Sequence, residues 1–129
     1  MIVVDTNVIA YLLIRGERSE AMDRLLADDR EWVAPRLWID EFINILCTYE
    51  RNGLIDSGES LSLLTDALAL MDGQSYEVPP ARILGVARRT GCSGYDSQYV
   101  ALAEDLGTKL YTCDKKVLRT CPEIATLPK

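Results

Sequence analysis

The sequence predicts an α/β fold, a three-layer α/β/α sandwich in which a parallel sheet lies between two layers of helices. Short apolar runs alternate with longer amphipathic segments along all 129 residues. The first run, Ile2–Val4, has three consecutive apolar residues, which is typical of a strand that is covered on both faces. Because strands that alternate with helices are joined by right-handed crossovers, the sheet is expected to be parallel.

The pattern alternates between strand and helix along the chain, with one or two helices between successive strands. We expect strands at residues 2–4, 32–34, 76–78, 109–112 and 124–127, the last at a sheet edge. We expect helices at about residues 8–14, 20–27, 35–51, 57–71, 80–90, 95–106 and 115–118.

Residues that favour helix ends set these boundaries. Ser19 is expected to cap the second helix, and Pro35 to occupy the first turn of the third. Asp56 and Glu59 have the spacing of a capping box, and Gly91 is expected to end the fifth helix.

Composition indicates a single globular domain, residues 1–129, with 48% hydrophobic and 26% charged residues. No apolar run approaches the length needed to span a membrane. The N-terminus lacks the features of a signal peptide, so we expect a cytoplasmic protein. The four cysteines show no CxxC spacing and are expected to be reduced, apolar core residues.

The chain contains no histidine, which excludes Ser-His-Asp and Cys-His catalysis and histidine-ligated metals. Catalysis would have to use carboxylates, hydroxyls, lysine, tyrosine, cysteine or a metal bound by oxygen. The net charge of −6 argues against a general nucleic-acid coat protein but is compatible with a nuclease whose carboxylates bind cations.

Acidic residues occur where predicted elements begin or end. Asp5 follows the first strand and Asp114 the fourth, so in neighbouring parallel strands their carboxylates would emerge at one sheet edge. Each could instead be an ordinary helix cap. Asp96 has a similar alternative, because Ser93 and Asp96 resemble a capping box.

Glu41 lies within the predicted third helix and has no cation three or four residues away. Its neighbour Asp40, by contrast, is expected to pair with Arg36 on the surface. A carboxylate flanked by apolar residues needs a partner, which could be a metal; the alternative is an exposed glutamate on a polar strip. Acidic side chains brought together repel unless they are protonated or bind cations, and oxygen ligands favour Mg²⁺ or Mn²⁺.

Four segments, taken in order, resemble the PIN-domain ribonucleases, and most closely the VapC-type toxins of bacterial toxin–antitoxin pairs. They are residues 4–8, 38–44, 94–103 and 110–116. The resemblance implies a sheet of order 3-2-1-4-5, with a site at the switch point between the first and fourth strands. It implies that the metal-binding and catalytic acids are Asp5, Glu41, Asp96 and Asp114, supported by Asn7 and Thr112. Ser97 stands where relatives often have alanine, and could add a hydroxyl near the site.

The activity implied by the resemblance is hydrolysis of RNA phosphodiester bonds with Mg²⁺ or Mn²⁺, in the toxin of a type II toxin–antitoxin system. A small antitoxin would be the partner and a homodimer the expected assembly. Residues that could contact RNA are Arg15, Arg18, Arg36, Lys115 and Lys116.

Other classes of α/β protein also carry acids at strand ends. A non-catalytic or degenerate PIN-like module that acts through protein contacts is the main alternative. A receiver domain would need an aspartate at the end of the third strand, where Val78 and Pro79 stand. A haloacid dehalogenase-type phosphohydrolase would need aspartate at the position of Asn7.

Overall fold

The structure is a computed structural model that describes residues 1–129. Its strands are β1 (Ile2–Val4), β2 (Trp32–Pro35), β3 (Ser75–Tyr76), β4 (Leu110–Tyr111) and β5 (Ala125–Thr126). They form one sheet of order β3-β2-β1-β4-β5, in which every neighbouring pair is parallel. The predicted fold class and strand order are therefore confirmed.

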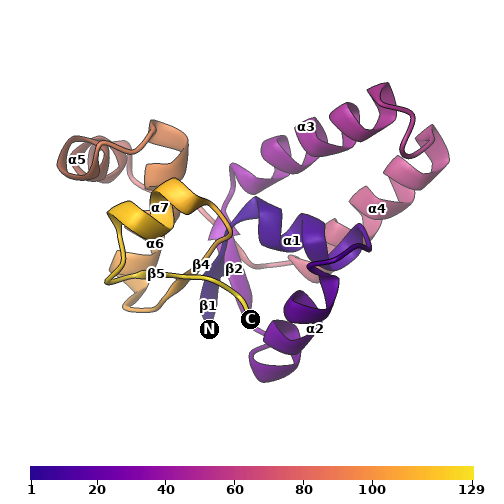
Figure 1. Ribbon diagram of the computed structural model, residues 1–129. Coiled ribbons are helices and arrows are strands. Elements are labelled where there is room, and N and C mark those ends of the chain that lie inside the picture. The colour runs from indigo at the N-terminus through magenta and orange to yellow at the C-terminus, as the bar shows by residue number, and fades with distance from the viewer.

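Helices flank the sheet on either side (Figure 1). They are α1 (Thr6–Leu13), α2 (Ser19–Asp28), α3 (Trp38–Arg51), α4 (Ser57–Leu70), α5 (Pro80–Thr90), α6 (Gly94–Leu106) and α7 (Lys115–Thr120). Helices α5, α6 and α7 form one group and α1 to α4 the other, with α3 and α4 extending from the body as a helical hairpin. None of these helices combines the length and the apolar character that a membrane-spanning helix needs.

The central strand β1 pairs with both β2 and β4. Val3 lies opposite Val33 on one side and Leu110 on the other, and Val4 lies opposite Tyr111. The chain order reverses between β1 and β4, which is where sites form in open parallel sheets. The residues that follow β1 and β4 therefore emerge side by side at one edge.

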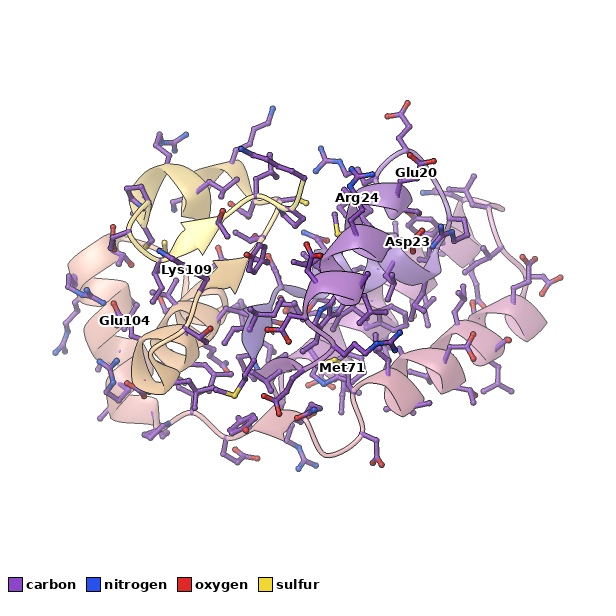
Figure 2. All side chains as sticks on the ribbon, turned by 90° about the horizontal axis from the view of Figure 1, so that it is seen from below. Glu20, Asp23, Arg24, Met71, Glu104 and Lys109 are labelled. Carbon is purple, nitrogen blue, oxygen red and sulfur yellow. The ribbon has the colours of Figure 1, made fainter.

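The core is built from the two faces of this sheet and the helices that cover them. Val3, Val4 and Val33 are fully buried, as are Val8 and Val100 on the covering helices α1 and α6. Each such side chain contributes about 1.5–3 kcal/mol through burial, so the strands next to the switch point are firmly held. Charged residues lie outside, as Glu20, Asp23 and Arg24 on α2 show (Figure 2).

Two predicted helix starts are wrong. Pro35 ends strand β2, opposite Tyr76, and α3 begins only at Trp38. Pro35 lies beyond the residues of β2 that pair with β1, so its missing N–H removes no ladder hydrogen bond there. Ser19 is the first helical residue of α2, and its hydroxyl accepts from Gly16 N and donates to Tyr11 O instead of capping.

Other local predictions have mixed outcomes. Asp56 and Glu59 form the reciprocal capping box at α4, and Gly91 ends α5 with a positive φ of 75°. Arg36, which was expected to pair with Asp40, instead lies 3.8 Å from Glu77, a residue on the loop after β3. All the cysteines are free; Cys92 and Cys121 are buried as predicted, whereas Cys47 and Cys113 are half-buried.

Candidate active site

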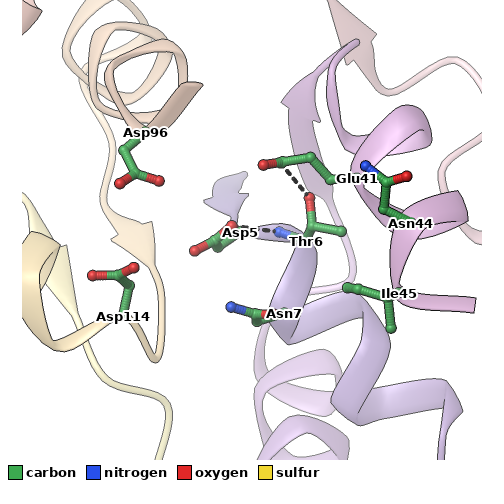
Figure 3. Close-up of a pocket in the computed structure, with 8 residues that line it drawn as sticks. All are labelled: Asp5, Thr6, Asn7, Glu41, Asn44, Ile45, Asp96 and Asp114. Carbon is green, nitrogen blue, oxygen red and sulfur yellow. Dashed lines mark hydrogen bonds between the residues drawn. The ribbon is translucent and has the colours of Figure 1, made fainter. Parts of the chain in front are cut away.

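An acidic pocket of about 310 Å³ lies where β1 and β4 end. Its lining contains the predicted acids Asp5, Glu41, Asp96 and Asp114, together with Thr6, Asn7, Asn44 and Ile45. Figure 3 shows acidic side chains converging on one space from elements far apart in the sequence. Only one of the lining residues is hydrophobic, so this pocket is suited to a charged or strongly polar ligand.

Asp5 lies at the centre of this arrangement, between the end of β1 and the start of α1. Its Oδ1 accepts a 2.7 Å hydrogen bond from the backbone N of Thr6, and its Oδ2 accepts a 2.8 Å bond from Thr112 Oγ1. Burial raises the pKa of Asp5 to about 6, and the nearby Glu41 and Asp96 carboxylates act in the same direction. The sheet therefore holds this carboxyl in a place that disfavours its charge.

Asp114 is connected to Asp5 through Thr112. The backbone N of Asp114 donates a 3.0 Å hydrogen bond to Thr112 Oγ1, the same hydroxyl that donates to Asp5. The Asp114 side chain caps α7 by accepting from Val117 N at 3.0 Å. Thr112 thus fixes the ends of β1 and β4 relative to each other.

Asp96 approaches from the first turn of α6, and its carboxylate faces that of Asp114 (Figure 3). Its backbone N donates to Ser93 Oγ at 3.0 Å, so the capping interaction expected from the sequence is present. Burial raises the pKa of Asp96, as does repulsion from Asp114 and Glu41. The cap of α6 uses the backbone N of Asp96, and the cap of α7 uses one carboxylate oxygen of Asp114, so these two acids keep oxygens available in the pocket. Both oxygens of Asp5 already accept a hydrogen bond.

Glu41 reaches the pocket from α3 and is half-buried. Its Oε1 accepts hydrogen bonds from Thr6 Oγ1 at 2.9 Å and from the Tyr99 hydroxyl at 2.6 Å. Sequence reasoning did not identify Thr6 or Tyr99 as site residues. Tyrosine at a core position of α6 was the available signal, because a buried tyrosine hydroxyl requires a hydrogen-bond partner.

No basic side chain forms an ion pair with these acids, although the charge of Lys116 acts to lower the pKa of Asp96, against the larger effects that raise it. The ion pairs of the structure join other residues, and none includes Asp5, Glu41, Asp96 or Asp114. Carboxylates that share a pocket without a basic partner repel one another, which a hard cation with oxygen ligands would relieve. The donor set therefore fits Mg²⁺ or Mn²⁺.

The acids are gathered but not yet arranged as a closed ligand set. No group of three or more acidic or cysteine side chains is close enough to hold one metal ion as the side chains stand. Coordination would require rotation of the acidic side chains.

The other predicted site residues are distributed unevenly. Asn7 and Thr112 lie at the acidic site, whereas Ser97 is fully buried, lies outside the pocket lining and has a hydroxyl without a partner. Lys115 and Lys116 are exposed in the first turn of α7, immediately after Asp114.

The predicted arginines lie outside the pocket lining. Arg15 forms a bidentate ion pair with Asp23, and Arg36 pairs with Glu77. Arg18 lies over the Tyr11 ring at 5.2 Å.

Comparison with solved structures identifies the same fold. A protein from Pyrobaculum aerophilum, PAE2754, aligns with a TM-score of 0.76 and 24% identity, covering 95% of this chain and 81% of that one. FitAcB from Neisseria gonorrhoeae aligns with a TM-score of 0.72 and 19% identity, covering 99% and 98%. A toxin–antitoxin complex from Klebsiella pneumoniae aligns with a TM-score of 0.67 and 13% identity, covering 100% and 98%.

Sequence comparison reaches further than fold. Residues 2–122 match the PIN domain. Ribonuclease VapC3 of Pyrobaculum aerophilum is 31% identical over 128 residues, which cover 97% of this chain and 98% of the relative. The chain therefore belongs to the PIN-domain family and is related within it to VapC proteins.

Proposed function

We propose that this protein is a divalent-metal-dependent endoribonuclease that acts as the toxin of a type II toxin–antitoxin pair. The observation that carries the proposal is the acidic pocket, which collects four carboxylates at the switch point of the sheet, none of them in an ion pair with a basic side chain. The relationship to Ribonuclease VapC3 over nearly the whole chain supports RNA as the substrate.

Asp5, Asp96 and Asp114 would hold Mg²⁺ or Mn²⁺, and Glu41 would complete the set or orient the attacking water. Such a cation, when bound, acidifies water and offsets negative charge on a phosphodiester. Thr112 keeps Asp5 in place through the bond to Oδ2, and Asn7 presents its side-chain amide to the pocket, where it can donate to a phosphate oxygen. The reaction adds water across one P–O bond of RNA.

The RNA backbone would lie along the basic start of α7. Lys115 and Lys116 are exposed beside Asp114, so their ammonium groups can contact phosphates next to the scissile bond. Arg15 and Arg36 are held by acidic partners and would have to exchange them for phosphate. Because these contacts are electrostatic, RNA binding should weaken as salt concentration rises.

An antitoxin would be the natural protein partner. Between α1 and the start of α4 lies an open groove of about 430 Å³, lined mainly by Leu13, Ile14, Leu54, Ile55 and Leu63. Its apolar floor suits the apolar face of a partner helix. Leu13 and Leu63 are therefore candidates for contact with an antitoxin. Leu12 and Trp38, two other apolar residues of α1 and α3, are buried in the core and cannot contribute to such a surface. A homodimer, the assembly that the family resemblance implies, stays a prediction.

Cleavage by an Asp5→Asn variant tests the proposed activity. The variant keeps the size of the side chain but removes one of the charges that would hold the cation, so Mn²⁺-dependent cleavage of a structured RNA should fall at least about 100-fold. Asp40→Asn is the matched control, because Asp40 is an exposed acid next to Glu41 that does not line the pocket.

Three outcomes separate the alternatives. Loss of cleavage in Asp5→Asn with full activity in Asp40→Asn supports the proposal. Full cleavage by folded Asp5→Asn contradicts the assignment of the site. No cleavage by the wild-type protein of any tested RNA, together with no effect of Mn²⁺ on its thermal stability, would favour a non-catalytic PIN-like module that acts through protein contacts.

A further inference from the structure

The hydroxyl groups of Thr6 and Tyr99 surround one oxygen of Glu41. Each lies within hydrogen-bond distance of Glu41 Oε1, at 2.9 and 2.6 Å, and the two hydroxyl oxygens lie 2.6 Å from each other, where either can donate. Each hydroxyl carries a single proton, so two protons serve three short contacts among these oxygens. Moving any one side chain would break its contacts with both of the others.

The two residues that carry the hydroxyls are themselves almost fully buried. Thr6 is 3% exposed and Tyr99 is 2% exposed, so both hydroxyls depend on protein partners. A tyrosine phenol is protonated near neutral pH, so the Tyr99 hydroxyl is able to donate. In such surroundings a hydrogen bond to a charged acceptor is strong, and its loss leaves a buried group unsatisfied.

The contacts restrict what Glu41 can offer to the pocket. Oε1 contacts both hydroxyls, at least one of which donates to it, whereas Oε2 forms no hydrogen bond within the protein. The Glu41 carboxylate extends toward the space between Asp5 and Asp96 (Figure 3). We propose that Thr6 and Tyr99 are positioning residues that clamp Glu41 by Oε1 and present Oε2 alone to a divalent cation or its water.

The clamp also connects the three helices, α1, α3 and α6, that contribute residues to the pocket. Thr6 belongs to α1, Tyr99 to α6 and Glu41 to α3, so the three oxygens join both groups of helices across the sheet. Thr6 in addition donates its backbone N to Asp5 Oδ1. One residue therefore orients two of the acids, Asp5 through its backbone and Glu41 through its side chain.

This inference rests on the proposed metal-dependent function, and Mn²⁺ affinity measured by titration calorimetry tests it without RNA. Tyr99→Phe removes the hydroxyl and keeps the ring. Outer partners of metal ligands typically contribute 10-fold to 100-fold to metal affinity, so we expect Mn²⁺ binding to weaken at least about 10-fold. Tyr111→Phe is the matched control, because Tyr111 lies next to the site on β4 and its hydroxyl forms no hydrogen bond.

A double-mutant cycle separates positioning from general loss of structure. If Tyr99 acts through Glu41, then Tyr99→Phe should change Mn²⁺ affinity less than about twofold in a Glu41→Ala background, because the clamped group is already absent. A purely structural role would weaken binding by the same factor in both backgrounds. Thr6→Ser, which keeps the hydroxyl, should retain affinity, and the isosteric Thr6→Val should lose it even if Tyr99→Phe does not fold.

The outcomes distinguish this inference from the proposed function. Wild-type Mn²⁺ affinity in folded Tyr99→Phe and Thr6→Val, or equal losses in the two backgrounds, would overturn the clamp alone. A wild-type protein that binds no Mn²⁺ would overturn the proposed function and the clamp with it.

Discussion

Asp5 is the residue on which opposing forces are most evident. Two hydrogen bonds hold its carboxylate at the end of β1, yet burial and neighbouring acids disfavour its charge. The pKa is raised from 3.8 to about 6, which means that the folded protein holds the Asp5 proton more tightly than the unfolded chain. A site that gathers anions is therefore a source of instability until a cation enters.

The stability of the metal-free protein should depend on pH through this residue. Above about pH 6 the folded state keeps Asp5 ionised at a cost; as pH falls from 6 to below 4, the folded state gains its proton first and the cost disappears. A shift of this size corresponds to up to about 3 kcal/mol. Asp5→Asn should therefore raise the free energy of unfolding at pH 7.5, and the gain should shrink toward zero near pH 4.

Urea denaturation in EDTA at a series of pH values measures this difference between Asp5→Asn and the wild-type protein. A difference that stays constant between pH 4 and pH 7.5 would show that Asp5 has an ordinary pKa in the folded state. A stability difference that grows as pH falls would instead indicate that the pKa of Asp5 is lowered in the folded state.

At the scale of elements, helix α5 shows how one residue type can have opposite effects at two positions. Gly91 ends the helix in the left-handed region with φ 75°, a conformation that a side chain makes strained. Gly85 lies on the exposed side of the same helix, and a Cβ placed there would meet no atom within 4 Å. The backbone conformation, and not the available space, distinguishes the two sites.

Alanine at these positions should shift stability in opposite directions. Gly91→Ala should lower the free energy of unfolding by about 1 kcal/mol, because the left-handed conformation disfavours a Cβ. Gly85→Ala should raise it by about 0.5–1 kcal/mol, because alanine loses less backbone entropy in a helix. Chemical denaturation of both variants at one pH checks the prediction, which two shifts of the same sign would contradict.

At the scale of the whole molecule, the pocket joins parts of the chain that the sheet alone does not connect. Its acids come from the ends of β1 and β4 and from helices α3 and α6, which lie in the two groups of helices (Figure 1). A cation bound there would tie these groups together, so metal binding and global stability should be linked.

Mn²⁺ should therefore raise the unfolding temperature relative to EDTA. At a concentration 100 times the dissociation constant, a ligand specific to the folded state stabilises it by about 2.7 kcal/mol. Asp114→Asn should lose most of the shift, whereas Asp72→Asn, an exposed acid after α4, should keep it. Differential scanning calorimetry gives the comparison, and equal shifts in both variants would place the cation elsewhere.

Much of the fold could be predicted because its signals are local. The run Ile2–Val4 indicates a strand buried on both faces, and Asp56 with Glu59 marks a helix start within four residues. The extent of short strands could not be predicted, since β4 and β5 are limited by their pairing with neighbours. The prediction that Pro35 begins a helix failed for a related reason. Only the register of β2 shows that Pro35 is the last strand residue and lies beyond the pairing with β1.

The sequence by itself determined that acids follow the buried strands, that histidine chemistry is absent and that the order of motifs resembles one family. Only the tertiary structure decided which groups meet: Glu41 bonds Thr6 and Tyr99, which are 35 and 58 residues away, and Arg36 turns to Glu77. The reason is that the periodicity of apolar residues and the capping of helices depend on residues within one turn or one strand. Side-chain partners depend instead on the register of strands and on how helices pack across the sheet.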